Sequence, residues 1–309
     1  MPELPEVETL KLGLQKYVVG KTITDVNVID SSLVTGNVKD IIGANIIDVK
    51  RYAKGLVLEL SNGNVAAFHI KLTGQLIYRD KENKDLEVLK PSPSKVPNKF
   101  TRVDIVLGSH PERSEGSQDS SVTPQNDKRN DEHLYFQEVR KFAWMKILPL
   151  ADLKTLPFFK TLGPEPIPSP GSGTPKLKLD MFEKIVLKSN LPIKTLLMDQ
   201  QKIGGIGNIY ANDSLFEAKI DPRRKAKSLS IIEIKTLFDS ILKILKKGIK
   251  YRGSSELNFV DILGQKGKYQ NHFLIYGRKG KECRREDGGI VEKVYLGGRG
   301  TFYCTKCQK

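Results

Sequence analysis

The main change in the pattern of apolar residues falls between residues 163 and 175, and it constrains the fold more than any other feature. Between residues 20 and 163, short apolar runs are separated by Gly and Asn, as in the turn Ser61-Asn62-Gly63-Asn64, which is typical of strands and hairpins. After residue 175, apolar residues recur at three- and four-residue steps, which is typical of helices. The stretch between, residues 163–175, is rich in Pro, Gly and Ser, as linkers are. We therefore predict two domains, each large enough in this 309-residue chain to bury a core.

The first half is predicted to be an antiparallel β-sandwich or barrel with a helix packed on it. Residues 5–18 place Val7, Leu10 and Leu14 at helical spacing, and Pro5 suits a first helical turn. Runs with strand character follow at 23–29, 44–52, 56–60, 65–70, 75–78, 102–107, 134–139 and 143–148.

One long segment interrupts these strands. Residues 108–133 are polar and carry three basic against six acidic side chains. Such a composition cannot bury an apolar face, so we predict a disordered insertion within a hairpin. The alternative is a regulatory or partner-binding loop.

The second half is predicted to be helical, with a small finger at its end. Amphipathic helices are expected at 179–186, 208–218 and 229–249, and residues 274–309 resemble a two-stranded finger. The fold class is therefore α+β and multidomain. The predicted units are a β-sandwich domain at 1–150, a linker at 151–175, a helical domain at 176–273 and a finger at 274–309.

The positive charge is concentrated in that second half. The chain has 51 Lys and Arg against 36 Asp and Glu, a net charge of +15. Residues 1–175 hold 23 basic and 22 acidic side chains, whereas residues 176–309 hold 28 and 14. A field this uneven favours a polyanionic partner, nucleic acid before an anionic membrane. The alternative is a basic surface that serves only solubility.

Other features favour a cytoplasmic protein. No run of about 18 apolar residues is present, so no membrane span is expected. The N-terminus has neither a basic region nor an apolar run, so no signal peptide is expected. Three cysteines are too few for a disulfide framework.

The first residues offer chemistry as well as a helix start. Removal of the initiator Met would expose Pro2 as a secondary amine, and α-amino groups have a pKa of about 7.7–8. Such an amine can attack a sugar C1′ and form an iminium, and Glu3 and Glu6 could act as general acid and base. The alternative is an ordinary N-terminus, with Pro and acidic residues in the first turn.

The sequence MPELPEVETL, read with later motifs, resembles the bacterial formamidopyrimidine-DNA glycosylases, in the family that includes endonuclease VIII. Leu4 stands where the endonuclease VIII branch typically has Gly, so the resemblance favours the formamidopyrimidine branch. It covers nearly the whole chain apart from residues 108–133. The later matching motifs are Ala53-Lys54-Gly55, His69 to Gly74, Arg140-Lys141-Phe142, Leu162-Gly163-Pro164-Glu165-Pro166, Ile193-Lys194, Gly205 to Ala211, and Tyr276-Gly277-Arg278 to the C-terminus.

This resemblance implies a bifunctional glycosylase and abasic-site lyase that removes oxidised purines, 8-oxoguanine and formamidopyrimidines, from duplex DNA in base excision repair. By the same resemblance, Pro2 is the nucleophile that displaces the damaged base at C1′, and Glu3 is the general acid and base. The strand is then cleaved by β- and δ-elimination. Lys54 contacts the damaged nucleotide or transfers protons, and Glu6 and Lys194 support the site. We expect a monomer, in the cytoplasm and associated with the nucleoid of a bacterium. The alternatives are an oxidised-pyrimidine glycosylase of the endonuclease VIII type and a damaged-DNA binder without activity.

The resemblance also implies DNA-binding positions. A glycosylase extrudes its target nucleotide and must fill the gap, and the family does so with an apolar wedge, an Arg and a Phe. The matching residues are Leu72, Arg140 and Phe142, of which Arg140 would recognise the orphaned cytosine. The remaining DNA-binding positions are His69, Asn208 at the helix–two-turn–helix turn and Arg299 in the finger.

The C-terminal finger departs from the family, which binds zinc there with four cysteines. This chain has Cys283, Cys304 and Cys307, while Glu286 stands in place of the second cysteine. A carboxylate can bind zinc, so one ion held by three thiolates and Glu286, or by the adjacent Asp287, is expected. The alternative is a finger held by packing, without metal.

Three further positions complete the comparison with the family. Asp213 replaces a Glu, and Asp221 replaces a His. Residues 252–259 fall where the family has a loop that covers the extruded base.

Overall fold

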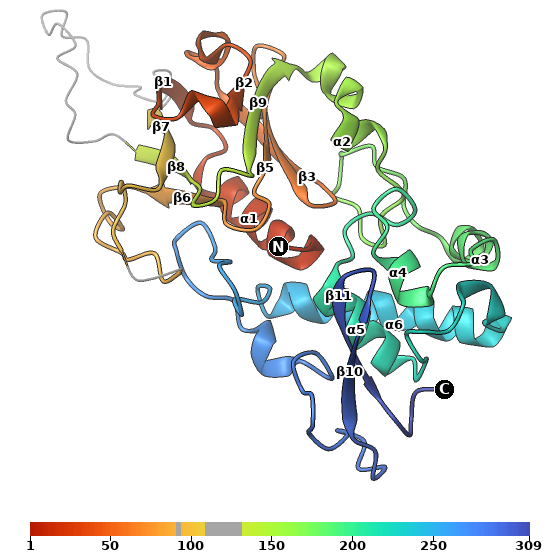
Figure 1. Cartoon of the computed structure of the whole chain (residues 1–309). Helices are drawn as coiled ribbons and strands as arrows, with labels where there is room; N and C mark the ends of the chain where they lie inside the picture. Colours follow the sequence, from red (N-terminus) through yellow and green to blue (C-terminus); the bar gives the residue numbers. More distant parts are fainter. Residues whose placement is uncertain (91–93, 109–131) are drawn as a thin grey trace, which may run out of the picture.

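The computed structural model describes residues 1–90, 94–108 and 132–309. A β-rich part and a helical part lie one above the other, with the N-terminus of the chain between them (Figure 1). Most of the predicted insertion, residues 109–131, lies outside the described residues. Gly108 ends one strand and Glu132 and His133 begin the next, so the strands reach into the segment predicted as 108–133.

The β-rich part is a sandwich of two sheets, as predicted. One sheet has the strand order β1-β7-β8-β6 and the other β2-β9-β5-β4-β3. All neighbours pair antiparallel except β2 and β9, which form a short parallel pair. The strands are β1 (Thr22–Val28), β2 (Val34–Thr35), β3 (Ile46–Tyr52), β4 (Gly55–Leu60), β5 (Asn64–His69), β6 (Gln75–Arg79), β7 (Thr101–Gly108), β8 (Glu132–Gln137) and β9 (Trp144–Pro149).

Helix α1 (Leu4–Tyr17) joins the two parts of the molecule. Its apolar residues Val7, Leu10 and Leu14 pack into the core of the sandwich. Leu4, at its first turn, packs instead into the core of the helical part. The first residues of the chain are therefore fixed at the junction of the two domains.

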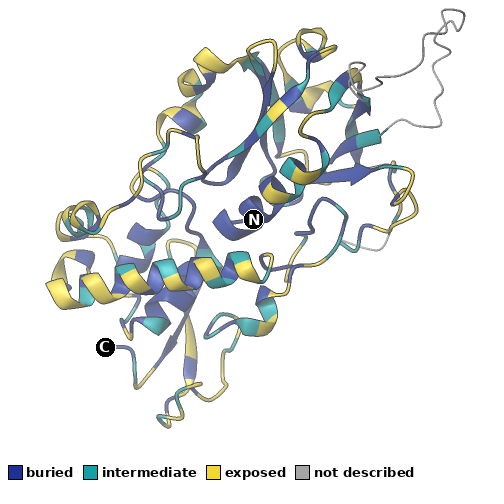
Figure 2. Cartoon of the chain, turned by 180° about the vertical axis from the view of Figure 1, so that it is seen from behind, coloured by how far each residue is buried: buried dark blue, intermediate teal, exposed yellow. Residues whose placement is uncertain are grey.

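The helical part is followed by a two-stranded hairpin, as predicted. The longest helix, α6, starts with a capping box between Ser230 and Glu233, and its outer face is exposed along its length (Figure 2). No helix within the described ranges is long and apolar enough to cross a membrane. The elements are α2 (Pro157–Lys160), α3 (Leu179–Leu187), α4 (Ile193–Leu197), α5 (Asn208–Glu217), α6 (Ile231–Lys250), β10 (Val291–Leu296) and β11 (Arg299–Cys304), with 3-10 helices at Ser31–Leu33, Val38–Ile41, Leu150–Thr155, Ala226–Ser228 and Tyr269–His272.

The segment predicted as a linker is tied to the first domain. Arg51 is fully buried and donates hydrogen bonds to Glu8 (2.7 Å), to Glu165 and to the carbonyl oxygen of Ile167 (2.5 Å). Glu165 in turn accepts the N–H of Ala53 (2.9 Å). The buried arginine therefore joins α1, β3 and the linker, and it fixes the turn that carries residue 54.

Residues 254–264 return to the first domain, although the sequence placed them in the helical one. Phe259 and Ile262 pack into the core of the sandwich. The N–H of Tyr78 donates to the carbonyl oxygen of Ile262 (2.7 Å), and that of Leu89 to Gly264 (3.0 Å). This loop therefore closes over the junction at which the N-terminus lies.

Candidate active site and nucleic-acid interface

Two carboxylates at the start of α1 connect the domains. Glu3 is the N-cap residue, and its own N–H donates to the carboxylate of Glu6 (2.8 Å) in a capping box. The Glu3 carboxylate also accepts the N–H groups of Ile209 (2.9 Å) and Tyr210 (3.4 Å), in the first turn of α5. These acids therefore cap a helix, as expected of an ordinary helix start, and they also lie together at a buried interface between the domains.

Burial changes the proton affinity of both acids. Glu6 accepts the hydroxyl of Tyr210 (2.6 Å) and the N–H of Ser254 (2.7 Å). Burial, and then the neighbouring Glu3, raises the pKa of Glu6 to about 7. Burial also raises the pKa of Glu3, although nearby Lys54 opposes this. Glu6 can therefore hold a proton near neutral pH, as an acid catalyst must, and the pKa of Glu3 is shifted in the same direction.

Lys54 lies in the tight turn between β3 and β4 and points into this junction. Its Nζ donates to the carbonyl oxygen of Ile206 (2.8 Å), and the side chain is buried. Ala53, the preceding residue, has a positive φ of 52°, which turns the chain inward. Burial lowers the pKa of Lys54 to about 8, so a neutral amine is accessible for proton transfer.

The glycine-rich turn before α5 leaves room for Glu3. A Cβ atom on Gly207 would lie 2.3 Å from Cδ of Glu3. Gly205 has a φ of +93° and its carbonyl oxygen accepts the N–H of Leu4 (3.0 Å). Glycine is therefore required here because the helix start approaches the N-terminus so closely.

Lys194, on α4, joins the helical domain to the finger. Its Nζ donates to Oδ1 of Asn208 (2.7 Å), to Oγ1 of Thr301 (2.7 Å) and to the carbonyl oxygen of Gly300 (3.0 Å). Burial lowers the pKa of Lys194 to about 7. Arg299, at the start of β11, is exposed close by and lines a groove together with Lys194. The predicted Lys194, Asn208 and Arg299 thus lie together.

A small pocket opens directly on the N-terminus. Its lining includes Met1, Pro2, Glu6, Leu72 and the loop of residues 254–259. This places the predicted wedge residue Leu72 and the predicted covering loop beside Pro2. Burial lowers the pKa of the terminal amine, which Met1 carries in the intact chain. Loss of Met1 would bring that amine to Pro2.

The two loops predicted to fill the gap in DNA lie side by side. Arg140 and Phe142 are exposed, Phe142 by 63%, and Leu72 is half-buried. A Cβ on Gly74 would lie 2.9 Å from Cβ of Ala143, so the loops are in direct contact. Exposed apolar and cationic side chains of this kind suit insertion between base pairs.

His69, also predicted to bind DNA, lies inside the protein. It packs against Trp144 and Phe158, and its Nδ1 accepts the N–H of Lys71 (3.0 Å). Burial, and to a lesser extent the positive charge of Lys71, lowers the pKa of His69 to about 3. A neutral ring therefore holds the start of the loop that carries Leu72.

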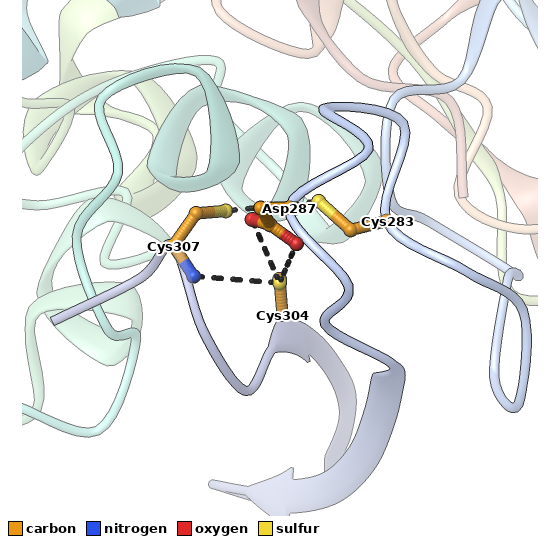
Figure 3. Close-up of side chains that lie close together, drawn as sticks. All are labelled: Cys283, Asp287, Cys304 and Cys307. Carbon is orange, nitrogen blue, oxygen red and sulfur yellow. Dashed lines mark hydrogen bonds between the residues drawn. The ribbon is translucent and has the colours of Figure 1, made fainter.

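Four side chains of the finger form a cluster that can hold one zinc ion (Figure 3). Ligand atoms of Cys283, Asp287, Cys304 and Cys307 all lie within 4.8 Å of one another. Sγ of Cys283 and Sγ of Cys307 are 3.8 Å apart, and tetrahedral zinc with Zn–S bonds of about 2.3 Å separates its sulfurs by about 3.8 Å. A Cβ on Gly289 would lie 2.5 Å from Sγ of Cys304, so the loop leaves space for the cluster.

The carboxylate in this cluster belongs to Asp287. Glu286, the position first expected to replace the missing cysteine, is exposed and has a φ of +55°. This backbone conformation turns the chain so that the next side chain faces the thiols. The N–H of Gly289 donates to Oδ1 of Asp287 (2.8 Å) and lowers the pKa of that carboxyl.

Asp213 and Asp221, the two positions that differ from the family pattern, both make contacts between the helical domain and the finger. Asp213 is fully buried and accepts the hydroxyl of Tyr269 (2.9 Å) and the N–H groups of residues 274–276. Asp221 pairs with Arg223, whose guanidinium stacks on the ring of Tyr303 (4.1 Å). Both acids therefore attach the finger to the helical domain.

Several residues at this junction were not found from the sequence. Tyr210 and Ser254 bind Glu6, and Glu138 and Thr73 connect the two exposed loops. Tyr210 lies within a recognised motif, but its hydroxyl contact is long-range. Thr73 and Ser254 also lie in recognised segments, residues 69–74 and 252–259, but only the fold brings them to Glu138 and Glu6. Glu138 gave no signal, because an isolated polar residue beside a strand has no periodicity to mark it.

The fold and the site define a β-sandwich joined to a helix–two-turn–helix domain, with buried ionisable groups around the N-terminus. Two family profiles match the chain: the formamidopyrimidine-DNA glycosylase N-terminal domain over residues 1–145 and the H2TH domain of the same glycosylase over residues 162–259. The chain belongs to the formamidopyrimidine-DNA glycosylase family.

Similar proteins include curated sequences and solved structures. The formamidopyrimidine-DNA glycosylases of Desulforamulus reducens and Streptococcus mutans are 32% and 33% identical to this chain. The first match covers 100% of this chain and 99% of its relative, and the second covers 100% of both. A Lactococcus lactis Fpg mutant, solved with DNA that contains Fapy-dG, has a TM-score of 0.78 at 29% identity, covering 100% of both chains. The Lactococcus lactis Fpg bound to DNA with an abasic site has a TM-score of 0.77 at 28% identity, covering 99% of each.

Proposed function

We propose that this protein is a bifunctional DNA glycosylase and abasic-site lyase of base excision repair that removes oxidised purines from duplex DNA. The observation that carries the proposal is the placement of Pro2 at a pocket beside buried Glu3, Glu6 and Lys54. Membership of the family supports it, as do the solved relatives in complex with DNA that contains Fapy-dG or an abasic site.

The reaction begins at the amine of Pro2 after removal of Met1. The nitrogen lone pair of Pro2 attacks C1′ of the damaged nucleotide and forms a new N–C1′ bond. The glycosidic bond between C1′ and the base breaks, and the base leaves with the electrons of that bond and the proton released from the Pro2 nitrogen. Glu3 donates a proton to the ring oxygen of the sugar, which opens, and an iminium forms between Pro2 and C1′. Burial raises the pKa of Glu3, which favours the protonated form that this step needs.

Strand cleavage follows from the iminium as an electron sink. Loss of a proton from C2′ expels the 3′ phosphate in β-elimination, and a second elimination expels the 5′ phosphate. Lys54, whose pKa is lowered to about 8, can accept or return a proton at this stage. Hydrolysis of the remaining iminium releases Pro2.

Phosphate binding belongs to the other side of the junction. Asn208, the first residue of α5, accepts a hydrogen bond from the buried Lys194, which lines a groove together with the exposed Arg299. Two basic side chains and an amide favour a phosphate there. Leu72, Arg140 and Phe142 fill the gap left by the extruded nucleotide, with Arg140 directed at the orphaned cytosine.

The zinc ion has a structural role in this proposal. Cys283, Asp287, Cys304 and Cys307 would hold it, and it would fix the finger in the orientation that presents Arg299. The protein acts on DNA as a monomer in the bacterial cytoplasm.

Borohydride trapping tests the proposal. Processed protein, with Pro2 shown to be N-terminal by mass spectrometry, should form a covalent complex with duplex DNA that contains 8-oxoguanine opposite cytosine. The control is the same chain with extra residues before Met1, which keeps every side chain but blocks the amine and should give no complex. Absence of trapping by the processed protein, or equal trapping by the extended one, would refute the role of Pro2. Faster cleavage of a thymine-glycol duplex than of 8-oxoguanine:C would instead indicate the pyrimidine branch.

A further inference from the structure

Glu138 is a fully buried carboxylate with no assigned role, and it lies at the junction of the two exposed loops. One loop, residues 70–74, joins β5 to β6 and carries Leu72. The other, residues 138–143, joins β8 to β9 and carries Arg140 and Phe142. Relative exposure of Glu138 is 0%.

The carboxylate of Glu138 holds both loops. One of its oxygens accepts the hydroxyl of Thr73 and the N–H of Arg140 (2.9 Å), and the other accepts the N–H of Ala143 (2.9 Å). The hydroxyl of Thr73 also accepts the N–H of Arg140 (3.3 Å). The two N–H groups bracket residues 140–142, so the carboxylate fixes both ends of the exposed stretch.

These contacts are not those of an ordinary ion pair. Among the described residues, the hydrogen-bond partners of the Glu138 carboxylate are one hydroxyl and two backbone N–H groups, without a charged side chain. A buried carboxylate is costly unless hydrogen bonds satisfy it. The sandwich core alone would be served as well by an apolar side chain, so the carboxylate is explained by what it holds.

The anchor of Glu138 itself is rigid. Its N–H donates to the carbonyl oxygen of Phe100 (2.9 Å), and its carbonyl oxygen accepts Nε of Arg102 (2.9 Å). Both partners lie at the start of β7 or just before it. Through Glu138, the two loops are therefore hydrogen-bonded to the sheet as well as to each other.

We propose that Glu138 is the positioning residue that sets Arg140 and Phe142 in register with Leu72, so that three side chains from two loops enter DNA as one unit. The inference rests on the proposed function, because it assigns the three side chains to the gap left by an extruded nucleotide. Rigid placement matters there, since a displacement of about 1 Å at a reacting site can cost about a hundredfold in rate.

The first measurement does not depend on catalysis. Glu138→Gln keeps the size of the side chain but replaces one acceptor oxygen by a donor. Hydrogen exchange of peptides that cover residues 70–75 and 138–143 should become about tenfold faster in both loops. The matched control is Glu59→Gln, a buried glutamate of β4 bound to Lys50 (2.7 Å), which should leave both loops unchanged.

The second measurement uses the reaction. Glu138→Gln should cleave 8-oxoguanine:C duplexes about ten- to a hundredfold more slowly, and it should lose preference for cytosine over adenine opposite the lesion. Cleavage of a single-stranded oligonucleotide with an abasic site, which needs no gap filling, should stay within about twofold of the wild type. Thr73→Val removes only the hydroxyl that links the loops, and it should lose part of the preference for cytosine over adenine.

Three results would overturn the proposal. They are unchanged exchange in both loops, an unchanged preference for the opposite base, and an equal loss on single- and double-stranded substrates, which would indicate general damage to the fold. If the wild type cleaves neither substrate, the proposed function fails, and hydrogen exchange alone decides whether Glu138 holds the two loops.

Discussion

The junction at the N-terminus and the cluster in the finger are both built from ionisable side chains, but they are satisfied differently. At the junction, Glu3, Glu6 and Lys54 find their hydrogen-bond partners in the protein itself. In the finger, the thiols of Cys283 and Cys307 face each other at 3.8 Å. The first cluster pairs acids with a base, whereas the second brings three thiols and a carboxylate within 4.8 Å of one another, an arrangement that suits a cation.

This difference separates what each cluster contributes. The junction is preorganised, so its proton affinities are set by the fold before DNA binds. In the finger, a zinc ion held by the four side chains would add order beyond that of the packed apolar residues. Damage to the junction should therefore remove activity while the fold persists, and damage to the finger should remove structure that zinc can restore.

The largest expected effect follows from Glu3→Gln. The amide can still accept an N–H from α5, so the fold should persist, but it cannot donate the proton that opens the sugar. We expect glycosylase turnover on 8-oxoguanine:C to fall about 10²- to 10⁴-fold, the usual contribution of a general acid. Single-turnover cleavage assays with matched thermal melts would measure both parts. A loss below tenfold would remove Glu3 from the acid role.

The corresponding change in the finger is Asp287→Ala. Removing one of four ligands should weaken zinc binding by at least about tenfold, the lower bound seen for changes outside the ligand set. Competition with a chromophoric chelator at fixed pH would measure the affinity. Glu286→Ala is the matched control, because its side chain is exposed and next in sequence. If Glu286→Ala lost zinc and Asp287→Ala did not, the ligand assignment would be reversed.

A smaller effect compares the glycines that leave room for each cluster. A Cβ on Gly207 would lie 2.3 Å from Cδ of Glu3, and one on Gly289 would lie 2.5 Å from Sγ of Cys304. Each Ala variant should lose about 1–3 kcal/mol of stability through overpacking. Urea unfolding with and without excess zinc would separate them, since zinc should partly restore only Gly289→Ala. Equal responses to zinc would contradict the distinction between the clusters.

The architecture could be predicted from the sequence because the spacing of apolar residues shows which face of each helix or strand is buried. The predicted strand at 65–70 corresponds to β5 (Asn64–His69), and the helix predicted at 208–218 corresponds to α5 (Asn208–Glu217). Motif resemblance likewise led to Pro2, Glu3 and Lys54, which the structure brings together. Helices, strands and short motifs of this kind depend on residues that are close together in the sequence.

Contacts between residues that are far apart in the sequence could not be predicted from spacing or motifs. The choice between Glu286 and Asp287 depends on one positive φ angle, which the letters of the sequence do not show. His69 was predicted to face DNA, but three-dimensional packing against Trp144 and Phe158 buries it. Glu138 was missed because its partner Thr73 lies 65 residues away in the chain.

The smallest expected effect concerns pH and distinguishes the junction from the finger once more. Burial raises the pKa of Glu6 to about 7 from its ordinary value of 4.5, so the folded protein binds this proton more tightly than the unfolded chain does. The stabilisation is fully present below about pH 4.5 and is lost as pH rises through about 7. Lys54 and Lys194, with pKa values lowered to about 8 and about 7, change their contribution mainly above this window. In urea unfolding between pH 5 and 7, the slope of stability against pH should therefore be more negative in the wild type than in Glu6→Gln, with zinc kept saturating throughout. His69, whose pKa is lowered to about 3, makes stability rise with pH in this window, but it does so equally in both proteins. Parallel slopes would mean that Glu6 is ionised across the whole range, and the buried proton would then have to be sought on Glu3.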